Sequence, residues 1–188
     1  MEKDKIKKIK IHLPMDTDTA AALNAGDNVL LTGVVYSARD AAHKRMYEAV
    51  TEAEAAGRDP KGCLPFPIEG AAVYYMGPSP ARPGQVIGSA GPTTSGRMDK
   101  YTPKLIGMGL KAMIGKGKRS DAVNEAIVRN GCVYLAAVGG AGALLSKCIK
   151  KSEVVAYDDL GAEAVRKLYV EDFPAIVVTD SRGVCLYR

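Results

Sequence analysis

The chain has 188 residues, of which 47% are hydrophobic, and its formal net charge is +5. This length and composition suit one domain, residues 1–188, with one hydrophobic core. The first ten residues hold five lysines against Glu2 and Asp4, and the chain has two Phe and no Trp, so charge and aromatic content both argue against a nucleic-acid partner.

No segment predicts a membrane anchor or an export signal. The longest nearly uncharged apolar run, residues 133–145, is shorter than the roughly 20 residues that a membrane-spanning helix needs. The basic start continues into residues 9–14 without the long apolar stretch of a signal peptide. We therefore expect a cytoplasmic protein with no membrane partner.

The four cysteines are too dispersed to form a metal site by themselves. Cys63, Cys132, Cys148 and Cys185 are separated by 69, 16 and 37 residues, which matches neither paired zinc-ligand motifs nor a ferredoxin-like run. We expect free thiols and no metal ligand on this chain.

The first half of the chain predicts strands and helices in alternation. Residues 5–13 alternate basic and apolar side chains with period two, as in an edge strand, and residues 16–24 suit a short helix. Residues 28–35 form a compact apolar run, and residues 38–56 then repeat apolar side chains at helical spacing up to Gly57. This pattern predicts a strand that leads directly into a long helix.

The middle of the chain combines short strands with two further helices. We expect strands over residues 71–75 and 86–89, flanking a turn-rich segment with three prolines. Thr102 is the expected cap of a helix with Pro103 at its first position and apolar residues as far as Met113. Ser120 begins the next helix, which Gly131 ends, and residues 132–138 read as a buried strand.

The last third predicts strands. Residues 153–157, 164–170, 175–179 and 184–187 carry strand-like patterns, and residues 180–183 suit a hairpin turn between the last two. Seven or eight strands and four helices give a mixed α/β layered domain.

One segment combines backbone turns with anion-binding side chains. Gly91, Pro92 and Gly96 bend the chain, Thr93, Thr94 and Ser95 supply three hydroxyls, and Arg97 can hold a carboxylate with two parallel hydrogen bonds. Asp99 follows, just before the predicted helix. The segment predicts one wall of a small-anion site, although a polar turn that caps the next helix is also compatible with it.

Arg39 stands where a predicted strand meets a predicted helix, a common position for ligand-binding residues in α/β folds. An arginine in the first helical turn opposes the helix dipole, and carboxylate capture is a sufficient reason for it. Asp40 and His43 follow within one turn. Asp40 is alternatively a first-turn carboxylate that favours the dipole, and His43 a surface residue.

Lys116 lies between Gly115 and Gly117, which let the backbone approach a ligand while the ammonium supplies a movable charge. The alternative is a basic surface loop that continues into Lys118 and Arg119. Because a four-carbon dicarboxylate has two charged ends, it needs two separate cationic clamps. Arg39 and Arg97 are the pair that we predict.

Nucleotide-binding motifs do not fit the chain. Gly115 and Lys116 are followed by Gly117, so the Walker spacing fails, and residues 139–142 lack the third glycine of a dinucleotide turn. Tight packing of a strand against a helix is a sufficient reason for those glycines, among them Gly140.

Several blocks together resemble the β-subunit, or C-terminal domain, of the class I iron–sulfur fumarases and tartrate dehydratases. They are Thr32-Gly33 followed by residues 38–43, the segment 91–99, residues 113–117 and residues 170–174. The resemblance covers nearly the whole chain. It implies the swivelling β/β/α fold and a hydro-lyase activity on a four-carbon dicarboxylate.

The resemblance also implies roles for individual residues. Arg39, Thr93, Thr94, Arg97 and Lys116 match substrate-contacting positions, with Thr93, Arg97 and Lys116 in the catalytic machinery. The residues expected to support them are Asp40, His43, Gly91, Ser95, Gly96, Asp99, Gly115, Gly117 and Gly140.

The same resemblance implies a [4Fe–4S] cluster, which the cysteine pattern places on another chain. We therefore expect a cluster-bearing α-subunit as partner, in an α2β2 heterotetramer that hydrates fumarate to malate. The alternatives are the β-subunit of L(+)-tartrate dehydratase and, in a different class, a non-catalytic dicarboxylate-binding or assembly subunit.

Overall fold

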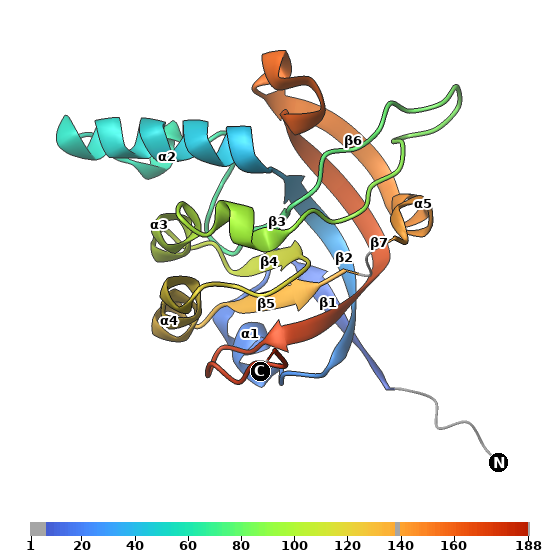
Figure 1. Ribbon diagram of the computed structural model, residues 1–188, viewed down its shortest axis with the longest axis horizontal. Coiled ribbons are helices and arrows are strands. Elements are labelled where there is room, and N and C mark those ends of the chain that lie inside the picture. Colours follow the sequence, from blue (N-terminus) through green and yellow to red (C-terminus); the bar gives the residue numbers. More distant parts are fainter. Residues whose placement is uncertain (1–6, 138–139, 188) are drawn as a thin grey trace.

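The computed structural model, which describes residues 7–137 and 140–187, is built around a seven-stranded sheet. Its strand order is β1-β2-β3-β4-β5-β7-β6, with a further pairing between β2 and β7 (Figure 1). The strands are β1 (Lys8–Leu13), β2 (Asn28–Ser37), β3 (Ala72–Tyr74), β4 (Ala112–Gly115), β5 (Val133–Ala136), β6 (Ile149–Ala156) and β7 (Val165–Thr179). The predicted α/β class is confirmed, and the finer swivelling β/β/α assignment stays a prediction.

The α-helices are α1 (Thr17–Ala22), α2 (Asp40–Ala55), α3 (Thr102–Gly107), α4 (Asp121–Asn130) and α5 (Gly142–Leu145). Short 3₁₀ turns are η1 (Lys61–Cys63), η2 (Ser95–Met98), η3 (Ser146–Cys148) and η4 (Asp158–Glu163). Of these helices, α4 has the clearest local signals. The Ser120 side chain accepts a hydrogen bond from the Val123 amide, and Gly131 ends the helix in the left-handed conformation, both as predicted.

Strands β2, β3, β4 and β5 run parallel to one another, so their carboxyl ends lie at the same edge of the sheet. The antiparallel strand β7 pairs with β2 along most of its length and with β5 near its end. The pairings therefore form a closed circuit through β2, β3, β4, β5 and β7.

Two hydrophobic clusters lie on opposite faces of the sheet. Neighbouring residues in a strand alternate between them: Ala72 and Tyr74 belong to one cluster, whereas Val73 belongs to the other. The second cluster includes Met46 of α2 and Ile127 of α4. Helices α2, α3 and α4 lie one above another along that side of the sheet (Figure 1).

Strand β7 corrects the prediction for the C-terminal third. Residues 164–170 and 175–179 belong to one strand, which passes through Pro174 in register with Leu30. Asp172 has a φ of 47°, and the register with β2 shifts nearby between Leu31 and Gly33. A β-bulge thus lets the strand continue where the sequence indicated a break.

Helix α3 is shorter than predicted. Its cap position is Tyr101 rather than Thr102, and the Thr102 hydroxyl donates instead to the Met98 carbonyl. The helix ends at Gly107, and Gly109 has a φ of 117°, which a side chain would oppose. Met113, expected on the apolar side of this helix, lies in β4.

Two predicted strands are absent from the described residues. Residues 86–89 belong to a long loop, in which the Ser79 amide donates to the Ser89 carbonyl. Residues 184–187 form only one antiparallel bridge, between Thr179 and Cys185, so the predicted turn is present without a second strand. The predicted start at residue 5 and the residues 138 and 139 lie outside the described part.

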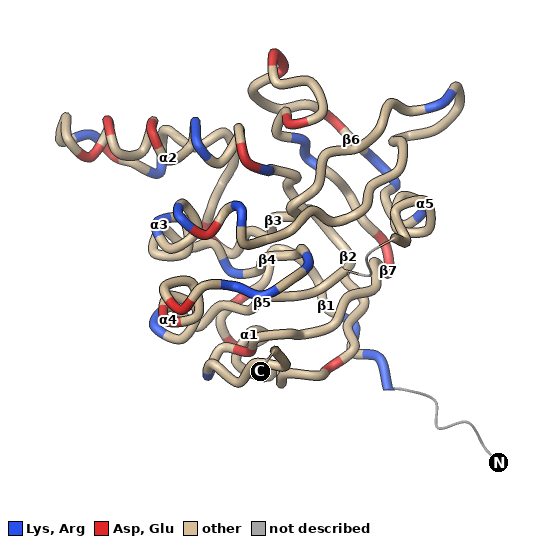
Figure 2. Tube along the Cα trace, in the orientation of Figure 1, with Lys and Arg blue, Asp and Glu red and all other residues tan. Residues whose placement is uncertain are grey.

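Charge is mixed along the surface helices. Basic and acidic positions occur together on α2 and on α4, whereas Lys104 is the one charged residue of α3 (Figure 2). Over residues 7–137 and 140–187, no helix is both long and apolar enough to cross a membrane.

Candidate functional site

The predicted anion-binding residues follow the carboxyl ends of parallel strands. Arg39 comes two residues after β2, and Lys116 comes directly after β4. The segment that begins at Gly91 joins this edge because the Thr93 amide donates to the Tyr75 carbonyl, just after β3, over 2.8 Å. Residues far apart in the sequence thus meet at one edge of the sheet.

The predicted anion-binding loop, residues 91–99, and Lys116 are joined through their backbones. Thr94 and Lys116 form a parallel bridge, and the Ser95 amide donates to the Lys116 carbonyl over 2.9 Å. The Lys116 amide in turn donates to the Ser95 Oγ over 3.1 Å. This pairing fixes the position of the Lys116 backbone relative to the loop hydroxyls.

Close approach at Gly115 makes this junction possible. A Cβ atom on Gly115 would lie 2.0 Å from the Ser95 Oγ and 2.9 Å from a ring atom of Tyr75. The Ser95 hydroxyl lies 2.9 Å from the Tyr134 hydroxyl, which donates to the Gly117 carbonyl over 2.8 Å. Burial raises the pKa of Tyr134 above its usual value, so this phenol stays protonated and can donate.

Arg39 and Arg97 meet at one carboxylate. The Arg97 Nε lies 2.7 Å from the Asp40 Oδ1, and the Arg39 Nε lies 3.4 Å from the Asp40 Oδ2. The Arg97 side chain is 50% exposed and the Arg39 side chain 23% exposed. The two predicted clamps are therefore adjacent, with Asp40 between them, rather than separated as the prediction of one clamp for each end of a dicarboxylate required.

The Asp40 carboxyl is held ionised. Its partial burial raises the pKa, but its own backbone amide, Arg97 and Arg39 together lower it by more, so the pKa lies below its ordinary value of 3.8. Asp40 is also the first residue of α2, where the helix dipole favours a negative charge.

Glu163 supports Arg39 from a distant part of the chain. One carboxylate oxygen accepts a hydrogen bond from the Ala41 amide over 2.9 Å, and the other lies 3.4 Å from an Arg39 amino group. Glu163 thus caps the start of α2 and orients the arginine that precedes it. Sequence reasoning missed this residue, because no local pattern links η4 to α2.

Arg119 is buried, so the alternative of a basic surface loop that continues into this residue is wrong for Arg119. Its side chain is 1% exposed, and its Nε donates to the Asp99 Oδ1 over 2.7 Å. Its two amino groups reach the hydroxyls of Thr102 and Tyr75, at 2.9 and 3.3 Å. The guanidinium also lies over the rings of Tyr75 and Tyr134, at 5.1 and 5.0 Å from their centroids.

Asp99, a predicted site residue, therefore has a structural role. It pairs with Arg119 and also accepts a hydrogen bond from the Ser120 amide over 2.6 Å. The end of the anion-binding loop is thereby attached to the start of α4.

His43 is buried, so its interpretation as a surface residue is wrong. It is 0% exposed, and its Nδ1 lies 3.0 Å from the Arg39 carbonyl. Burial, together with the nearby charge of Arg119, lowers the pKa of His43 to about 4, although the Arg39 carbonyl and Asp40 oppose the shift. A neutral imidazole therefore contacts the backbone of Arg39, one of the two predicted clamps.

The remaining predicted residues differ in their surroundings. Thr93 is partly buried, whereas Thr94, Gly96 and Lys116 are exposed at the loop surface. Gly91 packs against Gly142, where a Cβ on Gly142 would lie 2.9 Å from the Gly91 amide nitrogen. Gly117 and Gly140 have φ values of 83° and 80°, a conformation that favours glycine. A Cβ on Gly140 would have no neighbour within 4 Å, so no close contact links this glycine to the other predicted residues. The role of Gly140 in the site stays a prediction.

The described residues do not fit an iron–sulfur cluster. Residues 7–137 and 140–187 contain no group of three or more His, Cys, Asp or Glu side chains that could hold a metal ion. The thiols are free, and burial raises the pKa of Cys132 to about 12, which disfavours the thiolate that a cluster requires.

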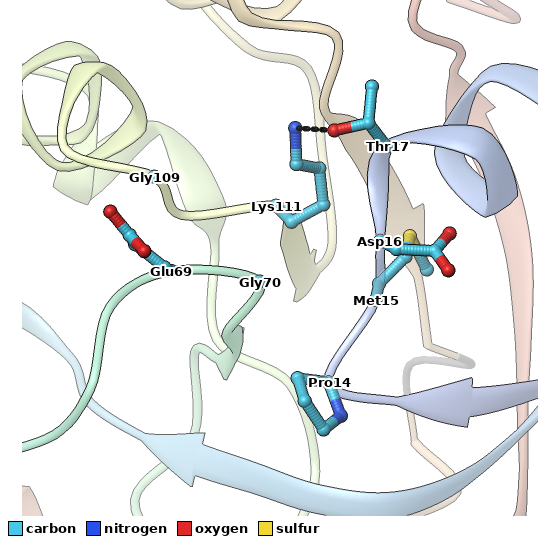
Figure 3. Close-up of a pocket in the computed structure, with 8 residues that line it drawn as sticks. All are labelled: Pro14, Met15, Asp16, Thr17, Glu69, Gly70, Gly109 and Lys111. Carbon is cyan, nitrogen blue, oxygen red and sulfur yellow. Dashed lines mark hydrogen bonds between the residues drawn. The ribbon is translucent and has the colours of Figure 1, made fainter.

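A separate cavity of about 430 Å³ lies at the opposite edge of the sheet, since its lining residue Lys111 directly precedes β4. Its polar groups are already engaged. The Lys111 ammonium donates to the Thr17 hydroxyl over 3.3 Å (Figure 3). It also donates to the Asn130 carbonyl over 3.1 Å. We assign this cavity no ligand.

Comparison with known proteins identifies related sequences. Residues 1–188 match the family described as Fumarase C-terminus. The chain is 41% identical over 155 residues to "Fumarate hydratase class I, anaerobic" of Escherichia coli K12, and 38% identical over 164 residues to "Fumarate hydratase 2" of Leishmania major. It is 37% identical over 172 residues to "Putative L(+)-tartrate dehydratase subunit beta" of Methanocaldococcus jannaschii.

These relatives differ in how much of them the chain covers. The first two alignments span 81% and 86% of this chain but only 27% and 28% of the relatives. The chain thus spans about a quarter of the length of the fumarate hydratases that it matches. The third alignment spans 88% of this chain and 84% of the M. jannaschii protein.

Proposed function

The chain belongs to the Fumarase C-terminus family, and from that premise we propose that it is the β-type subunit of a class I fumarate hydratase. The observation that carries the proposal is the meeting of Arg39 and Arg97 at Asp40, beside a hydroxyl-rich loop that is paired with Lys116. Two guanidiniums and an ammonium at one edge of a sheet suit a ligand with two carboxylates.

Each of these side chains has a proposed part in the reaction. Hydration adds hydroxide to one alkene carbon of fumarate and a proton to the other. Arg39 and Arg97 would hold the carboxylate beside the carbon that receives the proton, and Lys116 would add a movable positive charge. Thr93 would transfer that proton, with Thr94 binding next to it. Because a threonine hydroxyl is a poor acid and base near neutral pH, a second group must relay the proton.

The loop amides and hydroxyls would stabilise the negative charge that builds up on this carboxylate when the neighbouring carbon loses its proton. The Ser95 amide and hydroxyl are already used in the junction with Lys116. Ser95 is therefore assigned to the support of the site, with Asp40, His43 and Asp99.

The iron–sulfur cluster is proposed to belong to a partner. The chain covers only part of each class I fumarate hydratase that it matches, and one relative is named as a β-subunit. We infer a cluster-bearing α-subunit, a site shared between the two chains, and an assembly of two copies of each. The cytoplasm is the expected compartment.

L(+)-tartrate dehydratase is the second candidate, and the M. jannaschii relative favours it, since the alignment covers 84% of that protein. Tartrate carries one more hydroxyl than malate, and a single hydroxyl is discriminated by a few side chains. Some of those side chains would lie on the partner.

The test is an anaerobic assay with this chain alone, with the partner alone and with the co-purified pair. We expect only the pair to hydrate fumarate. Turnover of tartrate without turnover of fumarate would replace the first candidate by the second. A pair that assembles and turns over neither substrate would contradict both.

A further inference from the structure

The contacts at Asp40 involve the same atom of each arginine. Arg97 and Arg39 both reach the Asp40 carboxylate through Nε, each at a different oxygen. Nε is the nitrogen nearest the aliphatic stem, so a contact there leaves the two terminal amino groups of a guanidinium for other partners. Asp40 therefore contacts each guanidinium on the side nearest its aliphatic chain and does not occupy the two terminal amino groups.

One terminal amino group of Arg39 already has an acidic partner, whereas the acidic contact of Arg97 uses only its Nε. One Arg39 amino group lies 3.4 Å from Glu163, and the Arg39 side chain packs against Gly77, where a Cβ would lie 2.9 Å from the Arg39 Cδ. Within the described part of the chain, Asp40 is the one acidic partner of Arg97, and the Arg97 side chain is half exposed.

We propose that Asp40 is a positioning residue that fixes the planes of both guanidiniums, so that their terminal amino groups address one carboxylate of the substrate. This inference rests on the proposed function in taking that substrate to be a four-carbon dicarboxylate. Asp40 itself does not touch the reacting atoms in this account.

Electrostatics gives a second reason for a shared carboxylate. Two guanidiniums close enough to bind one carboxylate repel each other, and a negative charge between their Nε atoms offsets that repulsion before any ligand arrives. Asp40 can stay in place when the ligand binds, because the ligand uses other nitrogens of the same arginines. Preorganisation of this kind improves affinity by lowering the entropy cost of binding.

The geometry also permits the opposite role for Asp40, that of a competitor for the substrate carboxylate. The two roles predict opposite changes in dicarboxylate affinity when Asp40 is replaced. If Asp40 occupied the place of the substrate carboxylate, its removal would strengthen the binding of dicarboxylates. If it orients the arginines, its removal weakens that binding.

The variants are Asp40→Asn and Asp40→Glu, with Asp121→Asn as the matched control. Asp121 is likewise the first residue of a helix, α4, and is exposed, so its substitution removes the same type of dipole interaction away from the arginines. In the co-purified pair, we expect Asp40→Asn to raise KM for fumarate about tenfold with a smaller change in kcat. Asp40→Glu should restore part of the loss, and Asp121→Asn should match the wild type.

A second measurement is independent of catalysis. In the full-length chain, NMR signals of the Arg39 and Arg97 Nε–H groups should exchange slowly in the wild type and in Asp121→Asn, and rapidly in Asp40→Asn. Both signals persisting in Asp40→Asn would overturn the proposal, as would a lower KM. If the pair lacks fumarate hydratase activity, the NMR result still decides the role of Asp40, so the two failures are distinguishable.

Discussion

The Ser95 hydroxyl occupies the space that a side chain on Gly115 would need, and this contact joins the anion-binding loop to β4. We predict that Gly115→Ala destabilises the fold by about 1–3 kcal/mol, because the added methyl would overlap the Ser95 Oγ. Urea denaturation measures the free energy of unfolding directly.

Gly107→Ala is the control for this substitution. Gly107 is the last residue of α3, and a Cβ there would have no neighbour within 4 Å. Its replacement should be neutral or stabilising by up to about 1 kcal/mol, because alanine favours the helix. Equal effects of the two substitutions would contradict the steric account of Gly115.

His43 makes stability depend on pH. Burial lowers its pKa in the folded chain to about 4, whereas the unfolded value is near 6.5, so the unfolded chain binds more protons between these values. The free energy of unfolding should therefore fall as the pH falls from about 6.5 to 4, by up to about 1.4 kcal/mol per pH unit from this group. Above pH 6.5 the contribution is constant.

We predict that His43→Asn removes this slope, since asparagine does not titrate and can still donate to the Arg39 carbonyl. Urea denaturation at several pH values between 4 and 7 is the measurement. The same substitution at exposed His12 is the control. An unchanged slope in His43→Asn would show that other groups cause the pH dependence.

Among single residues, the sequence identifies those site candidates whose neighbours in the chain form a recognisable pattern. Arg39 follows an apolar strand pattern, and Lys116 stands between two glycines, so the local pattern was sufficient to propose both as site residues, and their roles stay predictions. Arg119 and Glu163 act through contacts with residues 20 and more than 100 positions away, and such contacts depend on tertiary packing. In the sequence, both are charged residues in polar segments and cannot be told apart from solvated surface residues.

Among the elements, Arg119 connects four parts of the fold. It contacts the anion-binding loop through Asp99 and α3 through Thr102. Its guanidinium also lies over the ring of Tyr75, just after β3, and over the ring of Tyr134 in β5. We predict that Arg119→Ala destabilises the chain by about 3–5 kcal/mol, because it leaves Asp99 without its buried partner. Chemical denaturation would measure this loss.

Lys104→Ala is a suitable control for Arg119→Ala, since Lys104 pairs with Glu54 at the surface, where ion pairs contribute about 0–1 kcal/mol. A loss below about 1 kcal/mol in Arg119→Ala would mean that the buried guanidinium does not hold these elements together.

The predicted helices and strands agree with the structure where local sequence signals are consistent. They differ from it where pairing between distant strands determines the secondary structure. Helices α2 and α4 have apolar side chains at helical spacing, and the caps of α4 are visible in the sequence. Strand β4 resembled a continuation of α3, because its apolar residues follow the helix closely, and only parallel pairing with β3 and β5 makes it a strand. Strand β7 crosses a proline through a bulge, which its pairing with β2 sustains.

For the whole molecule, the topology explains why the site exists. Residues 39, 97 and 116 are distant in the sequence, and the parallel order β2, β3, β4 brings their segments to one edge. The sequence indicated such a strand before Arg39, but it predicted helix as far as Met113 before Lys116, and it did not indicate the order of the strands. The additional pairing of β2 with β7, which closes the circuit, was not predictable from periodicity, because it depends on a long-range antiparallel register.

The central claim is that this chain supplies the carboxylate clamp of a shared hydro-lyase site, and kinetics of Arg97→Ala in the co-purified pair test it most directly. Arg129→Ala, at an exposed position of α4, is the control. Size-exclusion chromatography should show that both variants assemble. We expect Arg97→Ala to lower kcat/KM for fumarate at least about a hundredfold, because the carboxylate loses a charged, bidentate partner. Wild-type kinetics in an assembled Arg97→Ala pair would contradict the account.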